Sequence, residues 1–541
     1  MPRTVQRTLW FPLAGVSRRG GYRDQTRPYS APWAVNVRGV GPLERRQRGG
    51  SRPGLSKVSA TDFGTAITAV VPVTSVDSTG ARNRDLVVIA DGAFRYIRGV
   101  TVTTPTTELL DDNGIAVHTE AGDAIVFDST VSATAPGGVS DVFEAVEREG
   151  KLYLADSTLK VFDPLTGIVD SVVATAGVIP AACPLVTMYR DRLILGGTDH
   201  VFYASRQGTP TDWNFGADIG DTGRAFAAEA SGAGHIGEVI TAFITNGDRS
   251  MLVATANGLW LMRGDPAVDG SMSILNDNIG IIAPGAWAQS PEGAVAFLSN
   301  DGVFLVGVEG GAPVRFSVER DPVQLRNVSA ATNTITMAYD PRGRGFHLFI
   351  TPDAVDGVTA VGTHWWIDVE NKALWPVSLP AGMQPVAAAR VQGTSGLAEC
   401  VFGCRDGYLR KFSDGVATDD GTAIQSHVLI GPFRLSSDDI SDAMLTEIHG
   451  IMADNAGTVT WRVVAGSNPE EAADTAVAGI ASALAGTTIA GVAASGDWSE
   501  NRNKVARPRA RGPWVVVWLS STVAWSYEAV AVAINQLGRI R

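Results

Sequence analysis

The chain has 541 residues, of which 45% are hydrophobic, 18% are charged and 60 are glycine, and its formal net charge is −12. This length exceeds what one hydrophobic core usually serves, and the composition excludes a disordered or collagenous chain and favours a turn-rich β protein. Three cysteines are too few for a disulfide framework, and Cys400 and Cys404 lack the second ligand pair of a zinc site, so we expect buried, reduced thiols.

Charge divides the chain into three parts. Residues 1–57 contain twelve Lys or Arg and two acidic residues, and residues 501–541 contain seven and one, which leaves a net charge of −28 on residues 58–500. Residues 1–57 also have few periodic apolar positions and many Gly, Pro and Arg. Because such a segment cannot bury enough surface to fold alone, we predict an extended basic N-terminal arm that lies on another surface.

The second part, residues 58–430, repeats one pattern: an apolar strand, a short turn with Gly or Asp, and a second apolar or aromatic strand. RDLVVIADGAFRYIRG from Arg84 and GAVAFLSNDGVFLVGVEG from Gly293 are examples. Four-stranded units that recur about every 40–60 residues are typical of a β-propeller, whose blades bury their faces against neighbouring blades. We therefore predict an all-β protein with a propeller of six or seven blades; two packed β-sandwiches are the structural alternative.

The third part, residues 431–541, does not continue this repeated pattern. Strands such as TVTWRVVAG and RGPWVVVWLSS predict a separate C-terminal β-sheet or sandwich. The uncharged stretch from Thr475 to Ser495 has the length of a membrane span. It consists mainly of Ala, Gly, Thr and Ser, which favour insertion weakly, so we expect a surface loop, short helix or strand and no membrane anchor.

Motifs for catalysis are missing from the sequence. There is no phosphate-binding loop, zinc helix or nucleophile elbow, and the seven histidines stand singly. We therefore predict no catalytic residues, no metal site, no cofactor and no enzymatic activity. Six tryptophans in the central part are candidates for stacking sugars or bases, but their place within strands favours a role in the core. They are Trp213, Trp260, Trp287, Trp365, Trp366 and Trp375.

The basic arm is the strongest candidate for an interaction site. Its arginines lie among glycines, which suits nucleic acid, but basic ends and an acidic body also attract each other between subunits. We favour the second interpretation, in which the arm contacts a neighbouring subunit or an adaptor. The candidate interface residues are Arg23, Arg27, Arg45, Arg46, Arg48 and Arg52.

Several segments resemble the tail nozzle or tail hub proteins, also called tail tubular protein B, of short-tailed double-stranded DNA bacteriophages. In the arm they are Arg27-Pro28, Val35-Asn36-Val37, Pro42-Leu43-Glu44 and RGGSRPGL from Arg48 to Leu55. In the body they are YRDRLILGG from Tyr189, YASRQGTPTDWNFG from Tyr203, GLWLMRG from Gly258, IGIIAPGAW from Ile279 and FLSNDGVFLV from Phe297. The resemblance spans residues 20–310.

The resemblance implies a structural protein of the virion tail, assembled in the host cytoplasm as a homohexameric ring. Such a ring joins the head–tail adaptor or portal complex, can carry tail fibres or spikes, and conducts double-stranded DNA out of the capsid. An acidic body suits this role, because a lumen that repels phosphate does not hold the passing duplex. Two other functions remain open: a propeller that binds or cleaves host-surface glycans, and a cellular scaffold for protein partners.

Overall fold

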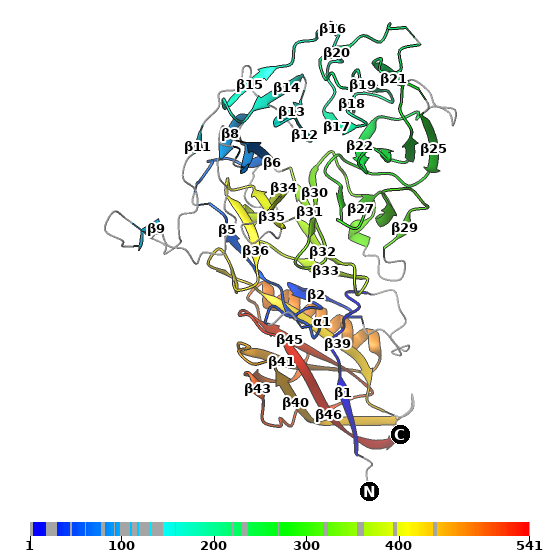
Figure 1. The fold of residues 1–541 in the computed structure, drawn as a ribbon. Coiled ribbons are helices and arrows are strands. Elements are labelled where there is room, and N and C mark those ends of the chain that lie inside the picture. Colours follow the sequence, from blue (N-terminus) through cyan, green and yellow to red (C-terminus); the bar gives the residue numbers. More distant parts are fainter. Residues whose placement is uncertain are drawn as a thin grey trace.

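The structure is a computed structural model. It describes residues 4–539 apart from 18–29, 44–45, 60, 77–79, 81, 91, 98–108, 111–115, 118–129, 132–143, 157, 219, 229–235, 269, 317–322, 354–361, 393–397 and 437–440. Within these limits the molecule consists of a ring of sheets above a layered C-terminal unit (Figure 1).

The ring is a seven-bladed β-propeller, as the strand pattern predicted. Each blade is a four-stranded antiparallel sheet, and the first strands of most neighbouring blades contact one another around the centre. Blade one contains β6 (Ile67–Val76), β7 (Arg82–Ala90), β8 (Ala93–Ile97) and β11 (Thr130–Val131); blade two contains β12 (Ala145–Arg148), β13 (Lys151–Ala155), β14 (Leu159–Asp163) and β15 (Ile168–Ser171); and blade three contains β17 (Leu185–Tyr189), β18 (Arg192–Gly196), β19 (Phe202–Ala204) and β21 (Phe226–Ala228). Blade four contains β22 (Ile240–Thr245), β23 (Ser250–Thr255), β24 (Leu259–Arg263) and β25 (Ser271–Asn276), and blade five contains β26 (Trp287–Gln289), β27 (Ala294–Ser299), β28 (Gly302–Gly307) and β29 (Val314–Arg315). Blade six contains β30 (Asn333–Asp340), β31 (Gly345–Pro352), β32 (Thr363–Asp368) and β33 (Ala373–Val377), and blade seven contains β34 (Pro385–Gln392), β35 (Ala398–Cys404), β36 (Leu409–Ser413) and β5 (Gly54–Lys57).

The seventh blade closes the ring with a strand from the start of the chain. Strand β5 pairs with β36 in antiparallel register, from Lys57 opposite Arg410 to Gly54 opposite Ser413. Apolar residues of the first and seventh blades then share one buried cluster, in which Ile67 packs near Val401. Ring closure leaves only short strand edges exposed, so the two ends of the propeller stabilise each other.

The C-terminal unit is a sandwich of two five-stranded sheets with a helix on one outer face. The first sheet contains β1 (Thr4–Leu9), β46 (Tyr527–Arg539), β40 (Ser441–Met452), β43 (Asn501–Arg502) and β44 (Ala510–Arg511). The second contains β2 (Ala34–Val35), β39 (Ser426–Arg434), β45 (Trp514–Ser521), β41 (Val459–Gly466) and β42 (Val492–Trp498). Alternate residues of β45 face opposite layers: Val517 joins the core between the sheets, and Trp518 packs against the helix.

The helix α1 (Pro469–Leu484) contains the first ten residues of the uncharged stretch from Thr475 to Ser495. Asn468 caps its start by accepting a hydrogen bond from the backbone N–H of Glu471, and Ala472, Ala476 and Ile480 bury one face against the second sheet. The last residues of the stretch enter β42. Among the described residues no helix is long and apolar enough to cross a membrane.

Smaller pairings complete the described elements. They are the antiparallel pairs of β3 (Val37–Arg38) with β4 (Gly50–Ser51), β9 (Leu109–Leu110) with β10 (Ala116–Val117), and β37 (Thr418–Asp419) with β38 (Thr422–Ala423); the parallel pair of β16 (Ala176–Gly177) with β20 (Asp212–Trp213); and the 3₁₀ turns η1 (Val323–Leu325) and η2 (Ala381–Met383).

The N-terminal segment is extended, but it lies on its own chain. Strand β1 pairs with β46, β2 pairs with β39, and β5 enters the propeller, so the segment contributes a strand to each sheet of the sandwich and to the seventh blade (Figure 1). The boundaries predicted at 57/58 and 430/431 therefore differ from the strands by a few residues: the propeller includes β5, and the sandwich strand β39 begins at Ser426.

Buried aromatic residues and thiols follow the sequence interpretation. Five of the six tryptophans singled out are buried, and the sixth, Trp287, is half-buried at the centre of the propeller. Cys183, Cys400 and Cys404 are free and buried.

Candidate functional site

Arg52, one of the predicted interface arginines, lies where the propeller, the sandwich and the N-terminal segment meet. Its side chain is fully buried, and its guanidinium binds both carboxylate oxygens of Asp419, at 2.8 Å for Nη1–Oδ1 and 2.5 Å for Nη2–Oδ2. Nη2 also donates to the carbonyl of Ser378 at 2.9 Å. The prediction that Arg52 contacts a neighbouring subunit is wrong, because its charge is neutralised inside its own chain.

Asn36 holds the other side of the same junction. Its backbone adopts a positive φ of 56°, a conformation that asparagine tolerates better than most residues. Its Oδ1 accepts hydrogen bonds from Nε of Arg52 and from the backbone N–H of Ser378, each at 2.8 Å, and its Nδ2 donates to the carbonyl of Gln425 at 2.9 Å. One side chain thus links the N-terminal segment to blade six and to the start of the sandwich.

The other predicted arginines fall into three groups. Arg48 forms an ion pair with Glu528 on β46 and donates to the carbonyl of Leu43, so it too has partners within the chain. Arg46 is exposed. Arg23, Arg27 and Arg45 lie outside the described residues. The arm arginines that the structure brings into contacts therefore serve the fold of this chain.

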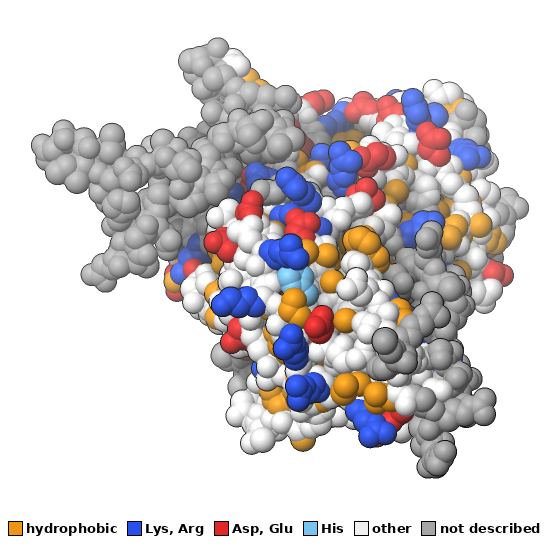
Figure 2. All heavy atoms as spheres, turned by 90° about the horizontal axis from the view of Figure 1, so that it is seen from below, with side chains coloured by type: hydrophobic (Ala, Val, Ile, Leu, Met, Phe, Trp, Pro, Cys, Tyr) orange, Lys and Arg blue, Asp and Glu red, His pale blue; other side chains and the backbone are white. Residues whose placement is uncertain are grey.

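The exposed basic surface lies at the other end of the chain. Residues 501–511, which we call the basic strap, run along β40 through the short strands β43 and β44 and the bridge between Ile448 and Ala506. The strap carries five exposed cationic side chains, on Arg502, Lys504, Arg507, Arg509 and Arg511. Lys and Arg side chains cross this face of the sandwich in Figure 2.

Neutralisation of the strap is partial. Arg511 forms an ion pair with Asp442 at 2.7 Å, and Arg507 lies 3.9 Å from Glu447; the side chains of these two arginines are 70% and 73% exposed. The structure describes no ion pair for Lys504 or Arg509. The sequence showed the positive charge of residues 501–541, but not that it collects along one strand edge.

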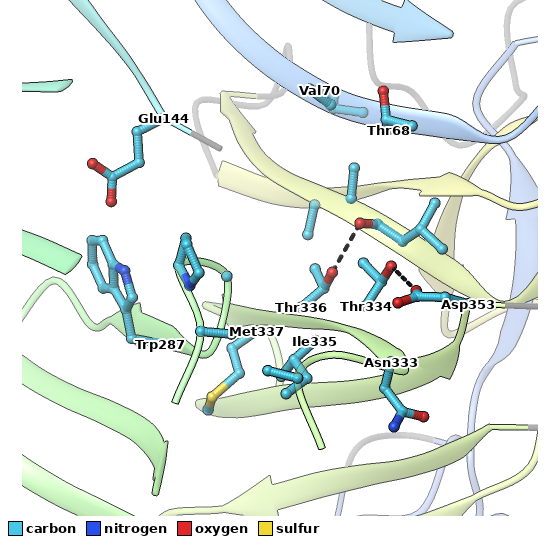
Figure 3. A pocket seen from close by; sticks show the side chains of 18 of the residues that line it. Thr68, Val70, Glu144, Trp287, Asn333, Thr334, Ile335, Thr336, Met337 and Asp353 are labelled. Atoms are coloured by element: carbon cyan, nitrogen blue, oxygen red, sulfur yellow. Dashed lines mark hydrogen bonds between the residues drawn. The ribbon is translucent and has the colours of Figure 1, made fainter. Parts of the chain in front are cut away.

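A cavity of about 660 Å³ occupies the centre of the propeller (Figure 3). It is lined by the first strands of four blades, β6, β26, β30 and β34, and by Glu144 and Asp353. Trp287 and Glu144 lie on one side of the cavity and Asp353 on the other. This volume suits a small molecule. Because stretches far apart in the sequence form the cavity, no local sequence motif predicts it.

Within the described part of the chain, no group of three or more His, Cys, Asp or Glu is placed to hold a metal ion. Three histidines, His347, His364 and His427, are buried, and burial lowers the pKa of His347 to about 4 and that of His364 to about 3. His347 is sandwiched between the rings of Phe349 and Phe412, which is a packing role.

Comparison with known proteins finds similarity among solved structures. No known protein family and no curated protein matches the sequence. Among solved structures, the WD40 β-propeller domain of Doa1 is similar to 66% of this chain over 97% of its own length, with 14% identity and a TM-score of 0.37. The extracellular domain of a putative one-component system from B. thetaiotaomicron is similar to 77% of this chain over 45% of its own length, with 12% identity and a TM-score of 0.39.

Proposed function

We propose that this protein is a structural subunit of a short bacteriophage tail, a tail nozzle or hub that assembles as a homohexameric ring. In this proposal the ring joins the head–tail adaptor or portal complex, offers sites for fibres or spikes, and conducts double-stranded DNA without enzymatic turnover. Its place is the virion tail, after assembly in the host cytoplasm. The segments that resemble tail nozzle proteins support the proposal.

The basic strap is the observation that carries the proposal. Its cations outnumber the two carboxylates that face them, Asp442 and Glu447, whereas residues 58–500 carry a net charge of −28. Opposite charges on different surfaces of one chain attract between copies, steer their encounter and fix their orientation. A strap on one subunit that meets an acidic surface of the next is therefore a suitable ring contact.

The size of the central cavity supports a DNA passage between copies in the proposed assembly. A cavity of 660 Å³ has the dimensions of a small-molecule pocket. Duplex DNA, whose major groove alone is about 12 Å wide, needs a much wider path. In the proposed assembly the conduit is thus the space around the shared axis of several chains, and each propeller serves as a wall element.

Assembly of the purified full-length chain tests this function. We expect rings in negative-stain images and a hexamer by mass photometry. The double variant Lys504→Glu/Arg509→Glu reverses two strap charges without breaking an ion pair that the structure describes, and it should shift the population toward monomers. The control Arg249→Glu/Arg263→Glu reverses two charges of blade four; it breaks the exposed ion pair of Arg249 with Glu309, which costs little, and should leave assembly unchanged. A chain that stays monomeric at micromolar concentrations would contradict the ring.

A further inference from the structure

The polar side chains that line the central cavity are acidic or uncharged, and none of those described is basic. Among the cavity's described lining residues are two acidic residues, Glu144 and Asp353, but no Lys, Arg or His. Anionic ligands such as phosphate or an acidic sugar would meet the negative charge of Asp353 there without a compensating cation. The lining therefore disfavours anions.

Most hydrogen-bond donors of the lining are already engaged. The hydroxyl of Thr334 donates to Oδ1 of Asp353 at 2.6 Å, and that of Thr336 donates to the carbonyl of Val386 at 3.0 Å. The amide nitrogen of Asn333 donates to the carbonyl of Ser329 at 2.9 Å and to Thr332. What these side chains still offer is acceptors: the second oxygen of Asp353, the amide oxygen of Asn333 and the lone pairs of the hydroxyls.

Glu144 adds a group of a different kind. Burial raises the pKa of its carboxyl to about 8, so the group is largely protonated at pH 7 and has one O–H to donate to a ligand. Its Oε1 is buried and has no hydrogen-bond partner among the described residues. In Figure 3 Glu144 lies on the same side of the cavity as Trp287.

Trp287 supplies an aromatic surface beside these polar groups. It begins the first strand of blade five, its side chain is half-buried, and it lines the cavity together with Pro284. An amphipathic ring of this kind packs the apolar face of a ligand while the surrounding acceptors bind the ligand's polar edge.

From this lining we infer that the central cavity binds a neutral, polyhydroxylated ligand, such as one to three uncharged sugar residues of a glycan. Sugar hydroxyls donate to Asp353, Asn333 and the threonines, and one of them accepts from Glu144, while a ring face stacks on Trp287. The volume of about 660 Å³ is sufficient for such a ligand and large for a simple amine. This inference goes beyond the proposed conduit, which needs no small ligand.

Binding by the full-length protein tests the inference independently of ring assembly. The probes are a panel of neutral oligosaccharides that end in glucose, galactose, mannose or N-acetylglucosamine, with sialyllactose as an acidic sugar and spermidine as a cation. Saturation-transfer NMR identifies a binder, and calorimetry measures its dissociation constant. We expect at least one neutral oligosaccharide to bind, and sialyllactose and spermidine not to bind.

Two variants then place the binder in the cavity. Trp287→Ala should weaken binding at least tenfold, and Asp353→Asn should weaken it severalfold, because the amide loses a charged acceptor but keeps its shape. Trp10→Ala is the matched control, since Trp10 is 56% exposed and lies outside the cavity. Circular dichroism verifies that each variant is folded. Failure of the whole neutral panel, binding of spermidine instead, or equal affinity of the Trp287 and Trp10 variants would overturn the inference.

Discussion

Arg52 and Asp419 form a buried, two-pronged ion pair across 367 residues of sequence, with Nη1–Oδ1 at 2.8 Å and Nη2–Oδ2 at 2.5 Å. Asp419 lies on β37, in the connection from the last propeller blade to the sandwich, and its Oδ1 also accepts from the backbone N–H of Leu55 at 3.1 Å. The pair therefore fastens the N-terminal segment at the point where the two large units of the molecule meet.

Replacing Arg52 with Met should destabilise the protein by about 3–5 kcal/mol, because Asp419 is left as an unpaired buried charge. The double variant Arg52→Met/Asp419→Leu removes both charges and should recover a large part of that loss. Urea unfolding followed by tryptophan fluorescence measures both changes. Arg206→Ala, which breaks an ion pair on the surface with Asp221, is the control and should have a small effect. Equal losses in the Arg52 and Arg206 variants would contradict a structural role for the junction.

The same pair shows where the sequence was insufficient. The run of arginines from Arg45 to Arg52 indicated positive charge at the N-terminus, but the charge of a residue does not reveal its partner. The fold brings Arg52 next to the carboxylate of Asp419, which neutralises its charge. It also brings Arg48 next to Glu528, which is likewise far away in the sequence. Local sequence therefore predicted an arm that contacts a neighbouring subunit or an adaptor, where the structure has a connection within the chain.

Leu55 is the buried centre of the strand that closes the propeller, opposite Phe412 on β36. Leu55→Ala should cost about 2–5 kcal/mol, because it removes core volume and weakens the pairing that completes the seventh blade. Val314→Ala, in the outermost strand of blade five, removes an apolar side chain that is 64% exposed and should have a much smaller effect. Thermal unfolding of the two variants side by side measures the difference; similar melting temperatures would show that β5 is dispensable for closure.

The blades themselves were predictable, since each depends on a local pattern of apolar strand residues and turn residues. In YRDRLILGG, the residues Arg190 and Asp191 take positive φ values of 51° and 57° and form the two-residue turn between β17 and β18. Alternation and turns of this kind predict a hairpin wherever they occur. The origin of β5 and the cavity lined by four blades depend instead on long-range contacts, which no single stretch of sequence encodes.

Acid should destabilise the protein through its buried histidines. Burial holds the pKa of His347 at about 4 and that of His364 at about 3, whereas both are near 6.5 in an unfolded chain. Between pH 6.5 and about 4 the unfolded state thus binds more protons than the folded state. The free energy of unfolding should fall with decreasing pH by about 1.4 kcal/mol per pH unit for each histidine.

The variant His347→Phe measures the contribution of one histidine to this pH dependence. It fills the space between Phe349 and Phe412 with a ring that does not titrate, so the slope of stability against pH should decrease by about 1.4 kcal/mol per unit across that range. Phe349→Leu alters packing at the same place without removing a titratable group, and it should shift the curve while keeping its slope. Urea unfolding at half-unit pH intervals distinguishes the two; an unchanged slope in His347→Phe would contradict the assignment.

Association through the basic strap should depend strongly on ionic strength. The cations of the strap are exposed, and the screening length between exposed charges falls from about 10 Å at 0.1 M salt to about 3 Å at 1 M. Raising NaCl from 50 to 500 mM should therefore weaken self-association by roughly tenfold or more, measured by sedimentation velocity. Lys504→Glu/Arg509→Glu should associate weakly at both concentrations and show a flatter salt dependence. Association that is equally strong at both salt concentrations would mean that apolar contacts, and not the strap, hold the subunits together.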